Sequence, residues 1–217
     1  MLGQEPPDRI NRPSIRVTGD AIVTVKPDQA EINIGVVTQA QTAQVAAAQN
    51  AQKQDVVISQ LRKAMGAGAD IKTISYSLSP NYRYPKEGGQ PTIIGYTASN
   101  IVQVKTGKLD EVGKVIDLAT ESGANNIQSL RFILKDEASA RTQALGEASN
   151  KARAKADAIA SALGLKIQRI LRVEESGPMV QPTVAFADAI RAQGQTPIEA
   201  GSIDVRASVT LTVEIAQ

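Results

Sequence analysis

The sequence contains no cysteine, no histidine and no tryptophan. The lack of cysteine excludes disulfide bonds, thiolate nucleophiles and sulfur-ligated metal ions. The lack of histidine excludes imidazole general bases and the common zinc and copper sites, which leaves only oxygen ligands for a hard cation. Most of the usual catalytic side chains are therefore missing, and we expect no catalytic residues, no cofactor site and no metal site.

Aromatic residues are also scarce, at 3% of the chain, and neither sign of charge dominates. Because 24 basic and 22 acidic residues give a formal net charge of only +2, nucleic acid is not expected as a partner. No apolar run approaches the roughly eighteen residues of a membrane-spanning helix. The first residues lack the basic and apolar regions of an export signal, so we expect either a cytoplasmic protein or a secreted one whose signal has been removed.

What the chain has instead is a long alternating segment near its C-terminus. Apolar residues occupy every second position from Ile203 to Ile215, and polar residues such as Thr210 and Thr212 occupy the positions between them. Successive side chains of a strand point to opposite faces. The segment therefore predicts one long strand with an apolar face toward the core and a polar face toward solvent.

Periodicity in the rest of the chain predicts hairpins interspersed with helices. Alternation predicts strands within residues 15–25, 30–36, 74–104, 127–134 and 167–173, and Gly19 is interpreted as a turn that splits the first of them. Helical spacing predicts helices within residues 41–65, 109–119 and 145–163. The apolar stripe of the third helix is assigned to Leu145, Ala148, Ala152, Ala156, Ile159 and Leu163. This order predicts an α+β fold with mainly antiparallel sheets built from hairpins, covered by three helices.

Two segments fall outside this pattern. Residues 1–13 are polar and contain three prolines, so they predict a flexible leader before a single domain at 14–217. Residues 176–201 predict a long loop, which carries the apolar residues Met179, Phe186 and Ile190. Because apolar residues in a long loop need a cover, this loop either folds back on its own domain or contacts another subunit.

Five short motifs, taken in order, resemble those of the SIMPL-domain family, and together they cover nearly the whole chain. Each motif alone is weak, and most of its residues have a structural explanation as turns and strands. The motifs are Ile15-Arg16-Val17-Thr18-Gly19 with Val25-Lys26-Pro27-Asp28-Gln29-Ala30, Ser79-Pro80-Asn81-Tyr82 with Gly95-Tyr96-Thr97-Ala98-Ser99-Asn100, Gly123-Ala124-Asn125-Asn126-Ile127 ending in Phe132, Lys155-Ala156 through Leu163-Gly164, and Thr196-Pro197-Ile198-Glu199-Ala200-Gly201.

The resemblance implies an exported protein of the periplasm or envelope of a Gram-negative bacterium. It also implies a loose link to stress tolerance and assembly into homo-oligomers, including rings, while animal relatives bind a protein partner. It supplies no catalytic residues, because the family has no agreed enzymatic activity. The absence of an export signal is explained most simply by its removal, with a cytoplasmic location as the alternative.

All four tyrosines fall in the hairpin expected around residues 76–96. Tyr82 and Tyr84 flank Arg83, and aromatic rings beside a cation are typical of surfaces that bind a sugar, a peptide or a single-stranded polymer. Tyrosine is also a common half-buried strand residue, so cross-strand packing or subunit contact explains the same pattern. We therefore treat Tyr82, Arg83, Tyr84, Met179, Phe186 and Ile190 as the candidate ligand or assembly surface.

Three functions follow from these observations. The first is a non-enzymatic envelope protein that self-assembles through exposed strand edges and the 176–201 loop. The second is a binding module that uses the tyrosine hairpin. The third is an enzyme restricted to carboxylate, lysine and tyrosine chemistry, and the sequence favours the first.

Overall fold

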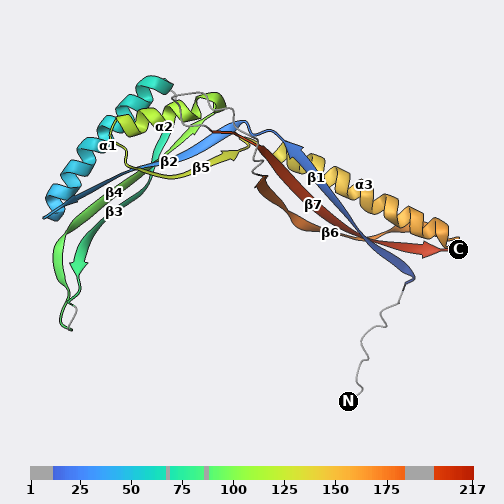
Figure 1. Cartoon of the computed structure of the whole chain (residues 1–217). Coiled ribbons are helices and arrows are strands. Elements are labelled where there is room, and N and C mark those ends of the chain that lie inside the picture. Colours follow the sequence, from blue (N-terminus) through green and yellow to red (C-terminus); the bar gives the residue numbers. More distant parts are fainter. Residues whose placement is uncertain (1–11, 67–68, 86–87, 184–197) are drawn as a thin grey trace, which may run out of the picture. The chain divides into compact units, whose positions relative to one another are not determined.

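The computed structural model describes residues 12–66, 69–85, 88–183 and 198–217, with the backbone alone for residues 178–183. Within these residues, three α-helices and two antiparallel sheets confirm the predicted α+β fold (Figure 1). The elements are β1 (Ser14–Val25), β2 (Gln29–Ala40), α1 (Ala43–Met65), β3 (Asp70–Arg83), β4 (Thr92–Thr106), the 3-10 helix η1 (Leu109–Glu111), α2 (Val112–Glu121), β5 (Asn126–Ile133), α3 (Ala138–Ala162), β6 (Lys166–Thr183) and β7 (Ser202–Ala216).

The described residues form two compact units, each with its own sheet. The three-stranded unit takes its described residues from 12–25, 136–183 and 202–217, and the four-stranded unit takes its described residues from 26–135 and 198–201. Of the leader expected at residues 1–13, the structure describes only Arg12 and Pro13. The single domain expected over residues 14–217 stays a prediction.

In the three-stranded unit, the strand order is β1-β7-β6, and α3 packs on one face of the sheet. The apolar row of β7 is buried, with Val205 and Val213 fully inaccessible to solvent. The intervening row, which includes Thr210 and Thr212, faces away from this core and is partly exposed. The prediction of an inward apolar row and an outward polar row is therefore confirmed.

Strand β1 is continuous, so the predicted turn at Gly19 is wrong. Gly19 is buried and lies directly against α3: a Cβ atom there would sit 2.1 Å from the Ala148 carbonyl oxygen and 2.3 Å from the Ala152 amide nitrogen. The glycine is required by the close approach of a helix to a strand, not by a chain reversal.

Strand β6 extends farther than the sequence indicated. Residues 176–183, assigned above to a loop, continue β6 and pair with β7, with Met179 opposite Arg206. The register shifts between Ser176 and Met179, where Gly177 and Pro178 form an irregularity in the strand. Such a bulge interrupts the alternation that marks a strand in a sequence, which explains the error.

In the four-stranded unit, the strand order is β3-β4-β2-β5, and α1 and α2 cover one face. Branched apolar side chains fill the space between helices and sheet, including Ile34 on β2, Val102 on β4, Val57 and Leu61 on α1, and Val112 on α2. All of them are fully buried. Among the described residues, no helix is both long enough and apolar enough to cross a membrane.

Candidate functional site

The tyrosine hairpin is formed by β3 and β4, as the sequence predicted. Tyr82 is 47% exposed and Tyr84, just beyond the end of β3, is 72% exposed. Their ring centroids are 6.5 Å apart, and the ring planes are inclined by 49°. Arg83 lies between them in the chain and is also exposed. The three side chains that the sequence proposed as a surface are therefore at the surface, at the end of one strand.

The exposure of β3 extends well beyond the tyrosine pair. Its residues are exposed or only partly buried along the whole strand. Tyr76 is 54% exposed and Leu78 is 40% exposed, although both are opposite residues on the helix-covered side of β4, Asn100 and Ala98. In Figure 1 the hairpin extends past the end of α1. Ala98 is nevertheless fully buried, and its carbonyl accepts a hydrogen bond from Asn50 of α1, so at the level of Tyr76 and Leu78 the helix covers β4 but leaves the edge strand β3 uncovered.

The structure does not place all of the candidate residues on one described surface. Met179 belongs to β6 in the three-stranded unit, where only its backbone is described. Phe186 and Ile190 lie outside the described residues. Side chains of the proposed surface are therefore described only in the hairpin, at Tyr82, Arg83 and Tyr84.

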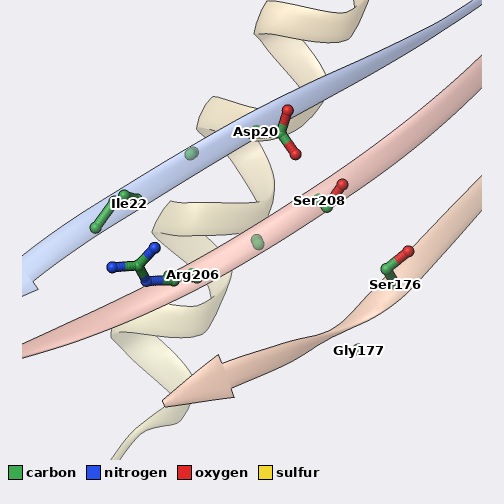
Figure 2. Close-up of a pocket in the computed structure, with 8 residues that line it drawn as sticks. Asp20, Ile22, Ser176, Gly177, Arg206 and Ser208 are labelled. Carbon is green, nitrogen blue, oxygen red and sulfur yellow. The ribbon is translucent and has the colours of Figure 1, made fainter. Parts of the chain in front are cut away.

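A depression of about 370 Å³, which the sequence analysis did not predict, lies on the open face of the three-stranded sheet (Figure 2). It lies where the irregular stretch of β6 passes beside β7. Its polar lining has one carboxylate, one guanidinium and two hydroxyls, while Ile22 adds an apolar wall. The labelled lining residues are Asp20, Ile22, Ser176, Gly177, Arg206 and Ser208.

The groups in this depression can accept or donate hydrogen bonds, but they contain no imidazole or thiol because the chain has neither. The Arg206 guanidinium lies 3.7 Å from the Asp204 carboxylate, so its charge is already partly matched. In the described part of the chain, no cluster of three or more acidic side chains is placed to hold a metal ion. The Gly177-Pro178 pair was the sequence signal for the depression, but it was interpreted as the start of a loop.

An ionic cluster around one buried carboxylate lies on the other face of the four-stranded sheet, away from α1. The carboxylate of Glu31 on β2 is only 9% exposed and pairs with Arg131 on β5 and, at 3.3 Å, with Lys105 on β4. Burial disfavours the charged carboxylate, but hydrogen bonds from the two cations outweigh it and lower the pKa of Glu31 below 4.5. The cluster joins three strands and has the properties of a structural element, because one carboxylate is held by two cations from the neighbouring strands.

Comparison with known proteins identifies relatives along nearly the whole chain. The 26 kDa periplasmic immunogenic protein of Brucella melitensis is 30% identical over 210 residues, which cover 93% of this chain and 84% of the relative. The uncharacterized protein YggE of Escherichia coli strain K12 is 26% identical over 208 residues, covering 93% and 84% of the two chains.

The YggE protein of Edwardsiella ictaluri is 26% identical over 170 residues, covering 78% of this chain and 71% of the relative. The family model described as SIMPL, a protein of unknown function (DUF541), matches residues 15–213. That match includes every described helix and strand except the first residue of β1 and the last three of β7. The chain therefore belongs to the SIMPL family.

Proposed function

We propose that this chain is a non-enzymatic protein of the bacterial envelope that acts by assembling with copies of itself. The observation that carries the proposal is β3, an edge strand whose Tyr76 and Leu78 are about half exposed. An exposed edge with apolar side chains is a ready partner for another strand, because its backbone donors and acceptors are unpaired on one side. The name of the Brucella relative supports a periplasmic location.

Size-exclusion chromatography with light scattering tests the self-assembly. We expect a defined oligomer that persists on dilution through the micromolar range. A clean monomer at micromolar concentration would overturn the proposal. We extend the proposal to a role in stress tolerance on the basis of the family resemblance, and survival of a strain lacking the protein under acid or oxidative challenge tests that role.

A second candidate function is recognition of a polymer by the tyrosine hairpin. It is favoured by the exposed Tyr82 and Tyr84 rings and by the cation of Arg83 beside them. Because the chain has no tryptophan, its tyrosine fluorescence reports directly on this hairpin. The probes are an N-acetylglucosamine hexasaccharide and a 15-residue oligothymidine.

Binding of either probe is expected to change tyrosine fluorescence, and a Tyr82→Ala, Tyr84→Ala double variant is expected to lose the response. Both residues are at least 47% exposed, so the double variant should retain the fold. The matched control is Tyr96→Phe, which alters a partly buried tyrosine of the same hairpin without removing its ring. A double variant that binds as well as the wild type would refute this function.

A further inference from the structure

The two longest edge strands of the molecule, β3 and β6, are protected very differently. β6 carries charged residues from Lys166 to Glu175, where Arg169 and Arg172 form ion pairs with Glu214 at 2.6 Å and with Glu174 at 2.8 Å. Beyond Glu175 the strand contains Pro178 and Pro182, which have no backbone N–H to donate to another strand. Charges on an edge oppose pairing with another strand, because a new partner would have to bury them. The stretch from Thr73 to Ser79 on β3 has no charged residue and no proline.

The two faces of this uncharged stretch have different chemistry. Tyr76 and Leu78 are on the face that α1 covers elsewhere, as their partners Asn100 and Ala98 show. Ser75, Ser77 and Ser79 alternate with them and are on the opposite face. All five side chains are exposed. An added strand would therefore cover apolar groups on one face and meet only small hydroxyls on the other.

We propose that two copies of this chain pair antiparallel through β3, around a two-fold axis that passes Ser77. The proposal rests on the self-assembly proposed above and specifies its interface. In this register Ser77 is opposite Ser77 of the second copy, and Tyr76 is opposite Leu78 of the second copy. Paired residues of antiparallel strands share a face, so the apolar side chains cover one another. The two sheets become one continuous sheet of eight strands.

The charges at the two ends of β3 favour a second copy over an unrelated peptide. Asp70 begins the strand and Arg83 ends it. Because the bulge at Ile74 adds one residue to β3, the antiparallel two-fold places Asp70 of each copy opposite Arg83 of the other, so the interface has an opposite-charge pair at both ends. The strand is thus complementary to itself in charge and in hydrophobicity.

The absence of cysteine makes this register directly measurable by disulfide cross-linking. Residues directly opposite in an antiparallel pair have Cα atoms about 4.5–5.5 Å apart, which lies within the range for a disulfide. Ser77→Cys is therefore expected to form a covalent dimer in most of the protein under a mild oxidant at low micromolar concentration. The variant exchanges one small side chain for another at an exposed position, so the fold should persist.

The matched variants Ser75→Cys and Ser79→Cys define the register. Each is offset from its own copy by four positions, roughly 13 Å along the strand, so neither alone should cross-link efficiently. Mixed together they are expected to form the heterodimer, because Ser75 of one copy is opposite Ser79 of the other. A dimer from Ser75→Cys alone, at the yield of Ser77→Cys, would contradict the register.

A charge placed at the axis tests the same interface without a cross-link. Ser77→Lys puts two ammonium groups opposite each other and is expected to lower the mass of the oligomer. Val173→Lys, on the β6 edge at a residue 60% exposed, should leave the mass unchanged. Circular dichroism confirms that both variants are folded.

The outcomes separate the interface from self-assembly itself. A wild-type protein that is monomeric overturns both proposals. A wild-type oligomer that survives Ser77→Lys, with no Ser77→Cys dimer, overturns only the pairing of β3. Loss of the oligomer in Val173→Lys alone would assign the interface to β6 and refute the proposal as well.

Discussion

Helix α3 packs on β1 and β7 through alanines, whereas α1 packs on β2 and β4 through larger side chains. The buried residues of α3 are all alanine, recurring every four positions: Ala140, Ala144, Ala148, Ala152, Ala156 and Ala160. Those of α1 include Val57 and Leu61, but also the amides Asn50 and Gln54. Each unit packs a helix on an antiparallel sheet. The three-stranded unit does so with small alanine side chains, and the four-stranded unit does so with larger side chains.

The difference shows that each unit requires its own separation between helix and sheet. An alanine buries little apolar area, so α3 must lie very close to the sheet for its contacts to be effective. Gly19 permits that approach because the strand has no side chain beneath the helix backbone. In the four-stranded unit, branched side chains hold the helix farther away, and the added space also accommodates buried polar groups.

Gly19→Ala is expected to have the largest effect of any substitution considered. The new methyl group would overlap backbone atoms of Ala148 and Ala152, which cannot move aside without shifting the helix. We expect a loss of about 3 kcal/mol or more in the free energy of unfolding. Thermal denaturation measures the loss, and hydrogen exchange should show faster opening of residues 14–25 and 138–162 than of β2 and β4.

The control is a glycine-to-alanine substitution within α3 itself. Gly146 is exposed in the middle of the helix, and a Cβ atom there meets nothing within 4 Å. Gly146→Ala should therefore stabilise the protein by about 1 kcal/mol, because alanine is the better helix former. If Gly19→Ala were as well tolerated as Gly146→Ala, the close approach of α3 to β1 would be wrong.

The second prediction concerns the amides beneath α1. Asn50 Nδ2 donates to the Val36 carbonyl at 2.7 Å and to the Ala98 carbonyl at 3.1 Å. Within the described chain, neither side-chain polar atom of the buried Gln54 has a hydrogen-bond partner. Because a buried group without a partner is destabilising, Gln54→Leu should stabilise the four-stranded unit by about 1–2 kcal/mol.

Asn50→Leu provides the opposite case on the same helix face. It removes two hydrogen bonds to strand carbonyls, and we expect a loss of about 1–2 kcal/mol. Urea unfolding of both variants measures the difference. Equal destabilisation by the two leucines would mean that Gln54 contributes a contact as important as that of Asn50.

The sequence predicted the elements that have a regular period and are covered on one face. The row from Ile203 to Ile215, the three helices and the tyrosine hairpin were all found, because each shows a period of two or near 3.6, although α3 begins at Ala138, before the predicted start at residue 145. Tyr82 and Tyr84 were identified as candidate surface residues because they flank Arg83 in the predicted hairpin, and the structure shows that both are exposed. Tyr76 was harder to place, since its exposure depends on how far α1 reaches across the sheet toward β3.

The errors occurred where the size of a side chain was taken as a guide to its burial. The stripe of α3 was assigned partly to Ile159 and Leu163, the larger apolar residues, but these are 39% and 63% exposed. A helix that must approach closely buries its smallest side chains and leaves larger ones at the edge. The glycine of β1 and the bulge at Gly177 were misread for a related reason. Only tertiary contact distinguishes a glycine needed for packing from one needed for a turn.

The smallest expected effect is a pH-dependent contribution of one ion-pair cluster to the stability of the four-stranded unit. The lowered pKa of Glu31 means that its ion pairs stabilise the four-stranded unit fully above about pH 4.5, and that this contribution is lost as the pH falls through the lower folded-state value. Glu31→Gln should therefore cost about 1 kcal/mol at pH 7 and nothing at a pH where the native carboxyl is protonated. Urea unfolding at both pH values measures whether the stabilities of the variant and the wild type converge in acid.

Glu174→Gln is the matched control in the three-stranded unit, where the carboxylate is 35% exposed beside Arg16 and Arg172, and it should change stability less at pH 7. A Glu31→Gln variant that remains equally destabilised in acid would show that packing of the side chain, not its charge, joins β2 to its two neighbours.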